Sequence, residues 1–425
     1  MVYGIDEQYP LERKDILVFI IGLFSFVKVR VMGTFGISEI LCFGLYLVVA
    51  NPLLWMKHKG VTNFFLMTML WLIGVFISDR YNDSNLTNSL KGLFNVVFLL
   101  GLIPFVYWAL YDKPSRMIYF WIGNAISSLI SFYFKQSIDL DEFSFDVWRV
   151  YAWYYPFIVL SGILYYKGKT LLSCVVIEAF GFWSLFHMSR NVFLTVTLSV
   201  CVILFLNSII NKDVSIDERI RLFKRKTLPL LFVLGIGCLG ISYTYEYLAS
   251  NKILGERAYQ KYYMQKNSEL GLTSGRSDFF RSLYLAKNKP LFGYGSYARN
   301  NEGMLESYYI EHNLEYDSFK LKDSMMPGHS YLMGGWVYAG ILGLIFWLYV
   351  LKLIGKYLLN GLLRDNKLIG INVLLTFTTL WNIFFSPFAN RLNFLFYIIM
   401  VVLTINARNS DEQVNDQNID YNPIV

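Results

Sequence analysis

The sequence is poor in charged residues. Only 16% of its 425 residues are Asp, Glu, Lys or Arg, and 55% are hydrophobic. A soluble globular chain carries about 25% charged residues, so this chain lacks the polar surface to cover itself in water. Aromatic residues make up 18% of it, which excludes intrinsic disorder. The composition therefore indicates a chain that lies in lipid rather than two or three soluble domains.

Cysteine and histidine are equally scarce, with four residues of each. Every cysteine lies inside an apolar run, which is typical of a small buried side chain and excludes a disulfide framework. The chain has no H-E-x-x-H and no Cys/His pairing at metal-ligand spacing. We therefore expect no metal and no cofactor. The cysteines are Cys42, Cys174, Cys201 and Cys238.

Two further features are missing. The residues before the first apolar run include Asp6, Glu7 and Glu12, so they form no basic signal-peptide region, and no A-x-A-like cleavage site follows. We expect that run to remain as an uncleaved membrane span. No internal repeat is visible, which disfavours a transporter built from inverted halves.

What the sequence has is a series of apolar runs of roughly 16 to 24 residues, the length that crosses a bilayer as a helix. They predict an all-α, polytopic integral membrane protein of about 12 transmembrane helices in a single domain, residues 1–425. The first and last runs are short, so eleven spans is the alternative. The runs begin near Ile16, Phe35, Thr62, Leu90, Met117, Val150, Thr170, Asn191, Leu228, Tyr331, Leu368 and Leu392.

Basic residues between these runs predict the orientation. Residues 212–226 carry six Lys or Arg, and alternation from there places Lys57, Lys113 and Arg116 on the same side. By the positive-inside rule this side is the cytoplasm, and both termini lie there. Residues 408–425 are predicted to be a disordered cytoplasmic tail. The net charge of +7 is thus a topology signal, and we expect no nucleic-acid partner.

One connection is much longer than the others. Residues 249–330 are predicted to form a large helical loop on the opposite side of the membrane. From Lys252 to Arg299 it has nine basic and three acidic residues, and from Asn300 to Asp323 two basic and six acidic. A basic external segment is a plausible site for an anionic substrate, and a solvated loop without chemistry is the alternative.

Within this loop, residues 272–290 are predicted to form one short helix that ends at a proline. Helical spacing places Arg276 on the same arc as Phe279 and Phe280, and turns Arg281 to the opposite side. An arginine beside an apolar face needs a compensating anion, and its planar fork suits a phosphate. An ion pair with an acidic residue of the loop is the alternative.

His329 lies in Pro327-Gly-His-Ser-Tyr331, directly before a span with Gly335, Ala339 and Gly343 at intervals of four. This small-residue stripe allows close helix packing and would hold His329 at the membrane surface. A histidine titrates near neutrality and can take a proton from an attacking hydroxyl. A satisfied interfacial histidine is the alternative, and the contexts of His58, His187 and His312 are less favourable.

Two more arginines, Arg190 and Arg391, are predicted at outer ends of spans, level with Arg276 and His329. Snorkelling to lipid headgroups is the alternative for each arginine. Glu178 and Glu39 are acidic residues predicted within spans, where charge is costly and indicates either function or an interhelical pair.

The order of these motifs resembles the O-antigen polymerase and O-antigen ligase superfamily. The matching elements are Ser189-Arg190 at the start of a span, Gly275-Arg276 before an external helix, Lys289-Pro-Leu-Phe-Gly-Tyr-Gly295, and Gly328-His-Ser-Tyr-Leu332 followed by Tyr338-Ala-Gly-Ile-Leu-Gly-Leu344. The resemblance covers residues 189–406, and it is closest to an O-antigen polymerase, because Ser330 stands where ligases commonly have Asn.

The resemblance implies a GT-C-like glycosyltransferase of the bacterial inner membrane whose active site faces the periplasm, so that the long loop is periplasmic. Its substrate would be an undecaprenyl-diphosphate-linked oligosaccharide, and a chain-length regulator would be a further protein partner. Arg190 and Arg276 match arginines thought to bind the diphosphate, and Arg391 matches a further one less closely. His329 matches the histidine thought to activate the acceptor, with Arg276 beside it in catalysis.

The residues fit this chemistry independently of the resemblance. A lipid diphosphate is a good leaving group, so the reaction needs cations for the growing charge and a base for the hydroxyl. This chemistry predicts a metal-independent, inverting glycosyltransferase, and the resemblance implies that it joins repeat units into polysaccharide. The alternatives are an O-antigen ligase that transfers the finished chain to lipid A-core, and a flippase or other transporter of lipid-linked oligosaccharides.

Overall fold

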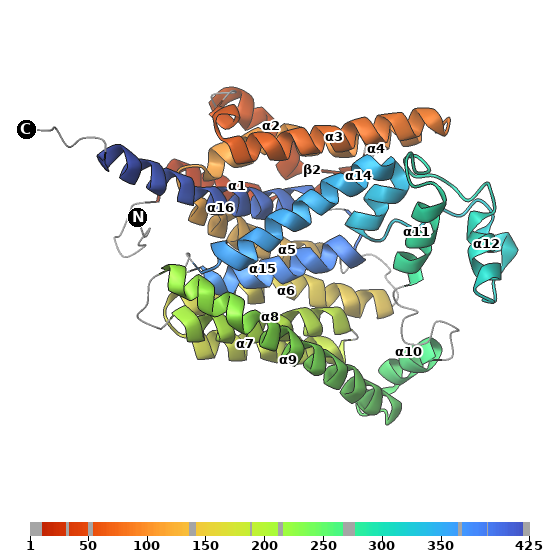
Figure 1. The fold of residues 1–425 in the computed structure, drawn as a ribbon. Helices are drawn as coiled ribbons and strands as arrows, with labels where there is room; N and C mark the ends of the chain where they lie inside the picture. Colours follow the sequence, from red (N-terminus) through yellow and green to blue (C-terminus); the bar gives the residue numbers. More distant parts are fainter. Residues whose placement is uncertain are drawn as a thin grey trace, which may run out of the picture.

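The computed structural model describes residues 11–30, 34–49, 54–135, 142–187, 189–210, 216–266, 277–363, 368–388 and 390–419. A helix coincides with each of the twelve predicted apolar runs (Figure 1). These helices are α1 (Arg13–Leu23), α2 (Ile37–Val49), α3 (Lys59–Tyr81), α4 (Leu86–Leu110), α5 (Met117–Lys135), α6 (Glu142–Tyr166), α7 (Thr170–Phe186), α8 (Arg190–Ile210), α9 (Ile216–Ser250), α14 (Tyr331–Lys356), α15 (Ile369–Phe385) and α16 (Arg391–Ile419). Short turns of helix, η1 (Leu54–Lys57), η2 (Pro114–Arg116) and η4 (Tyr357–Gly361), lie between some of them.

Five helical segments in the described part of the chain are long and apolar enough to cross a bilayer. The chain is therefore a helical membrane protein. Many large apolar side chains on the outside of the bundle are exposed, among them Leu66, Phe76 and Leu171, as expected for surfaces that face lipid. The five segments are Lys59–Tyr81, Leu86–Leu110, Pro114–Phe134, Arg190–Ile210 and Tyr331–Gly361.

The first two helices are too short to cross a bilayer alone. At 1.5 Å per residue, the 11 residues of α1 rise about 17 Å and the 13 of α2 about 20 Å, against a hydrocarbon core of about 30 Å. Between them the chain forms an antiparallel hairpin of β1 (Lys28–Arg30) and β2 (Thr34–Gly36). The predicted all-helical fold is confirmed, and this short hairpin is a local exception to it: the second apolar run was placed from Phe35, and β2 occupies its first residues.

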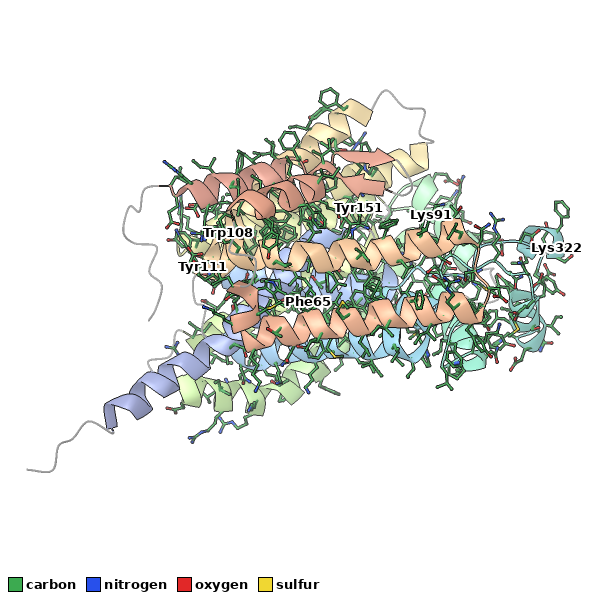
Figure 2. The ribbon with its side chains drawn as sticks, turned by 90° about the horizontal axis from the view of Figure 1, so that it is seen from above. Phe65, Lys91, Trp108, Tyr111, Tyr151 and Lys322 are labelled. Carbon is green, nitrogen blue, oxygen red and sulfur yellow. The ribbon has the colours of Figure 1, made fainter. Side chains whose placement is uncertain are left out.

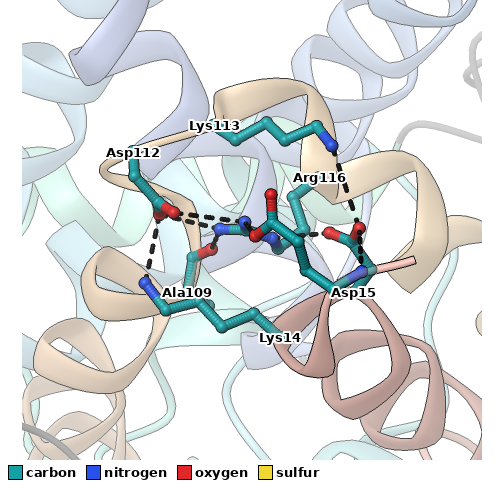
Figure 3. A network of polar contacts seen from close by, with 7 residues as sticks. Lys14, Asp15, Ala109, Asp112, Lys113 and Arg116 are labelled. Atoms are coloured by element: carbon teal, nitrogen blue, oxygen red, sulfur yellow. Dashed lines mark hydrogen bonds and ion pairs between the residues drawn. The ribbon is translucent and has the colours of Figure 1, made fainter. Parts of the chain in front are cut away.

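An ion-pair network joins the start of α1 to the turn between α4 and α5 (Figure 3). The fully buried guanidinium of Arg116 donates to Glu12, Asp15 and Asp112, with N···O distances of 2.5 to 2.7 Å, and to the Ala109 carbonyl. From the sequence, Arg116 was interpreted only as a residue that marks the cytoplasmic side. In the structure three carboxylates compensate its charge. This network lies at the end of the bundle where α3 begins and where Asn406 of α16 packs against Gly60.

The long loop folds onto the other end of the bundle. It contains α10 (Glu256–Lys266), α11 (Ser277–Asn288), α12 (Met304–Glu311) and α13 (Ser318–Leu321), and Figure 1 shows α10, α11 and α12 at the same end. Figure 2 shows Lys322 of the loop beyond the Lys91 end of α4, with Trp108 and Tyr111 towards the other end. The described residues of α1 therefore begin at the end opposite the loop.

Helix α14 breaks at Gly340, whose φ of 61° and ψ of −153° lie outside the helical region. The segment Leu291–Tyr294 occupies the break: Tyr294 N–H donates to the Val337 carbonyl at 2.7 Å, and Ile341 N–H to the Leu291 carbonyl at 3.1 Å. The two halves of α14 pack closely on each other, so closely that a Cβ on Gly343 would collide with the Gly335 carbonyl. The small-residue stripe therefore allows packing between the two halves of α14, in addition to packing of α14 on α3.

The last helix continues past Arg408 to Ile419, into the segment predicted to be a disordered tail. Residues 420–425 lie outside the described residues.

Candidate functional site

A cavity of about 490 Å³ lies where the loop meets the bundle. Its wall combines residues of α3, α4, α11, α14, the loop before α14 and the turn between α15 and α16. A cavity lined by apolar side chains with a few convergent polar groups is the usual form of a small-molecule site. The polar side chains in its wall include Asn95, Asp278, Arg281, Ser296, Ser324 and His329.

His329 is part of this wall and pairs with Asp278 of α11. The Nδ1 atom of His329 lies 2.9 Å from Oδ2 of Asp278. This hydrogen bond raises the pKa of His329 above its ordinary value, against the opposing effects of partial burial and of Arg281. It also holds the pKa of Asp278 below its usual range. An imidazole whose Nδ1–H is held by a carboxylate presents Nε2 as a base, which is the arrangement that general-base catalysis requires.

Arg281 completes this cluster. Its Nη2 atom lies 2.6 Å from Oδ1 of Asp278, so the carboxylate bridges the arginine and the histidine. Arg281 also donates to the hydroxyls of Ser277 and Tyr309. Helical spacing predicted that Arg281 points away from the face of α11 that packs on the rest of the protein. That prediction is wrong, because α12 packs on the other side of α11.

The backbone that carries His329 is held on several sides. The Ser282 hydroxyl donates to the Pro327 carbonyl at 3.0 Å, and the Tyr338 hydroxyl donates to the Met326 carbonyl at 2.9 Å. A Cβ on Gly328 would enter the ring of Tyr338, so only glycine fits before the histidine. These contacts position His329 from both α11 and α14.

Ser330 has a structural role at the next position. Its hydroxyl accepts from the Met333 N–H at 3.0 Å as the N-cap of α14, and donates to the Ile383 carbonyl at 2.8 Å. It therefore ties the start of α14 to the end of α15.

The Pro290–Gly295 segment leads directly into Ser296, which lines the cavity. Gly293 and Gly295 have positive φ values of 67° and 85°. At the end of α3, buried Asp79 accepts from the N–H and the hydroxyl of Ser296 at 2.6 and 2.9 Å, and Ser78 accepts from the Gly295 N–H. The segment therefore joins α3 to the break in α14 and supports one wall of the cavity.

Two of the other predicted arginines, Arg190 and Arg391, are not among the described residues that line the cavity. Arg190 begins α8, and its guanidinium lies over the ring of Tyr245 at 4.5 Å. Arg391 begins α16 and is bonded to Glu39 and Asn95. Arg276 lies outside the described residues, directly before Ser277 in the sequence. The structure thus brings His329 together with Asp278 and Arg281, which the sequence did not select.

Folding compensates part of the predicted excess of positive charge in the first half of the loop. Lys289 pairs with Glu302 of the acidic half at 2.8 Å, and Lys252 pairs with Glu256 at 2.9 Å. Sequence counting could not show this, because it does not reveal which charges meet.

The remaining histidines have local structural partners. His58 caps α3 by accepting from the Val61 N–H, and the rings of His187 and His312 bond to the carbonyls of Trp183 and Tyr308. Glu178 accepts from Thr197 at 2.7 Å. In the described residues Cys42 and Cys174 are buried and Cys201 is exposed; the side chain of Cys238 is outside them. No group of three or more His, Cys, Asp or Glu side chains in that part of the chain is arranged to hold a metal.

Comparisons with protein-family models, with curated proteins and with solved structures give no match for this chain.

Proposed function

We propose that this protein is an O-antigen polymerase, a membrane glycosyltransferase that joins undecaprenyl-diphosphate-linked oligosaccharide units into polysaccharide at the periplasmic face of the bacterial inner membrane. The observation that carries the proposal is the Asp278–His329 pair in a cavity at the loop end of a membrane bundle. A base at this level is accessible both to a lipid-anchored donor and to an acceptor from the aqueous side. The motif order described above supports the same reaction.

In the proposed reaction an acceptor hydroxyl attacks the anomeric carbon of the donor sugar. The hydroxyl proton passes to Nε2 of His329 while its oxygen forms the new glycosidic bond. The bond from the anomeric carbon to the diphosphate oxygen breaks, and the lipid diphosphate leaves with the electron pair. Asp278 stabilises the imidazolium that results, because its carboxylate already holds Nδ1–H. Direct displacement of this kind inverts the anomeric configuration.

The departing diphosphate requires positive charge. Arg281 is in the cavity wall, and Arg276 precedes the same helix in the sequence, so both are proposed to stabilise the leaving group. Arg281 also forms an ion pair with Asp278 at 2.6 Å, so only part of its positive charge is available to the diphosphate. Arg190 stays a predicted diphosphate ligand on the strength of the motif alone.

Purified protein in lipid vesicles tests the proposal. The substrate is the lipid-linked oligosaccharide extracted from cells that lack this protein. A ladder of longer lipid-linked products is the expected result. Extension only after addition of lipid A-core would indicate the ligase, and transfer of the oligosaccharide across the vesicle membrane without new bonds would indicate the transporter.

A pair of variants assigns the base. His329→Ala is expected to lower the rate by about 10²- to 10⁴-fold, the usual contribution of a general base. His312→Ala is the matched control, because His312 belongs to the same loop but its ring bonds to the Tyr308 carbonyl. Equal rates for both variants would exclude His329 as the base, and retention of the anomeric configuration in the product would exclude direct displacement.

A further inference from the structure

Asn95 lies where α4 borders the cavity, and its carboxamide has a fixed orientation. Nη1 of Arg391 donates to Oδ1 of Asn95 at 2.5 Å. A guanidinium carries only donors, so the amide oxygen must be the atom that faces it. The amino group of Asn95, with two N–H donors, is therefore on the side away from Arg391, and Asn95 is among the residues that line the cavity.

The group that orients Asn95 is itself rigidly held. Nε and Nη2 of Arg391 donate to the two carboxylate oxygens of Glu39 at 2.9 and 2.7 Å. Arg391 is 8% exposed and Glu39 5%. A buried two-point pair of this kind sets geometry, and it compensates the charge of the arginine. Arg391 therefore acts on the cavity through Asn95 and is a positioning residue.

The same cavity has aromatic walls. Trp71 of α3, Tyr331 of α14 and Phe388 line it, and the ring of Phe388 lies 5.7 Å from that of Trp71 and 4.9 Å from that of Tyr331. These residues and Asn95 come from the bundle, whereas Asp278, Arg281 and His329 come from α11 and the loop. Aromatic faces pack on the C–H faces of a sugar ring, while an amide donor bonds its oxygens.

We propose that Asn95 donates hydrogen bonds to a sugar oxygen of the lipid-linked oligosaccharide, in a subsite formed with Trp71 and Phe388. This inference rests on the proposed function, because it assigns a sugar subsite within the same cavity. Asn95 then contributes to specificity for the sugar and makes no contact with the lipid diphosphate.

Two ligands separate the sugar contribution from the lipid contribution. Binding of undecaprenyl diphosphate and of the lipid-linked oligosaccharide from cells lacking the protein is measured in nanodiscs. Asn95→Leu removes the donors and is expected to weaken binding of the oligosaccharide about 3- to 10-fold, the effect of one or two hydrogen bonds, without changing binding of undecaprenyl diphosphate. Asn207→Leu, a half-buried asparagine of α8 outside the cavity wall, is the control and should change neither.

A second pair of variants distinguishes the donor from a structural role. Asn95→Asp keeps an oxygen for Arg391 but has no amino group, so it should lose the sugar contribution as Asn95→Leu does. Arg391→Lys loses the planar fork and should lower oligosaccharide binding selectively. Wild-type binding by Asn95→Asp, or equal weakening of both ligands by Asn95→Leu, would overturn the subsite. Equal affinity of the wild-type protein for the lipid-linked oligosaccharide and for undecaprenyl diphosphate would also overturn the subsite. The proposed function is tested separately, by the polymerisation assay.

Discussion

Replacing Asp278 by Asn tests the proposed catalytic pair most directly. The carboxylate lies 2.9 Å from Nδ1 of His329, with the two side chains 33% and 65% exposed. Because the pair is open to solvent, its interaction free energy is taken as that of an exposed ion pair, about 0.2 to 1 kcal/mol. This interaction free energy is expressed as a shift of the pKa of His329, whose direction is set by Asp278.

The sign of the expected shift follows from the role of the imidazole. A general base works in its deprotonated form, so kcat/KM rises as pH rises through the pKa of His329. Asp278 raises this pKa, and Arg281 opposes it. Asp278→Asn removes the raising group and leaves Arg281 uncompensated, so both changes move the acid limb of the profile to lower pH.

The rate should fall at the same time. An Asn side chain can turn its amino group towards Nδ1, which favours the tautomer whose Nε2 carries a proton and cannot act as the base. We expect kcat/KM on the high-pH plateau to fall roughly ten- to hundredfold, as part of the 10²- to 10⁴-fold that a general base contributes.

The assay is the polymerisation rate with lipid-linked oligosaccharide from pH 5 to 9, for the wild type, Asp278→Asn and His329→Ala. His329→Ala should lack the limb altogether. An acid limb that stays in place in Asp278→Asn, or one that persists in His329→Ala, would refute the assignment of the base.

Two predictions concern the fold. Arg116→Met leaves three carboxylates around an uncharged side chain and should lower the free energy of unfolding by about 3 to 5 kcal/mol. Lys113→Met is the control and should have little effect, because the Nζ atom of Lys113 lies 3.8 Å from Asp15. Thermal unfolding in detergent measures both variants, and equal midpoints would show that the network of Figure 3 is not stabilising. Gly340→Ala forces a Cβ into the Leu291 carbonyl at φ 61° and should lower the free energy of unfolding by more than about 2 kcal/mol. Gly355→Ala in the same helix, with open space around it, is the control and should be neutral or stabilising. Unchanged stability of Gly340→Ala would contradict the observed break in α14.

The bundle is the part of the fold that the sequence predicts well. Each of the twelve apolar runs is a helix, because a long run of apolar residues in lipid has to satisfy its backbone hydrogen bonds internally. The number of membrane crossings does not follow from this, since α1 and α2 are helical but short. The hairpin β1–β2 was not predicted, because apolar residues such as Val29 and Phe35 occur in both helices and strands and a short apolar run does not distinguish the two.

The site is predicted only in part. His329 was selected from its place at the membrane surface, and the structure puts it in the cavity wall. Asp278 was overlooked, although it lies two residues after Arg276, because pairing across 51 positions of the chain leaves no local signal. Arg391 was expected to bind an anionic substrate, and an interhelical pair was one of the two interpretations of Glu39; the structure shows the two as a buried pair.

The sequence by itself determined that this chain lies in a membrane, where its helices fall, and which histidine stands at the end of the long loop. These properties depend on local composition and on the spacing of apolar residues. Only the tertiary structure decided which charges meet: Asp278 with His329 and Arg281, Glu39 with Arg391, and Arg116 with three carboxylates. Such pairings depend on how distant helices pack, and a break such as that at Gly340 redirects the chain in a way that composition does not encode.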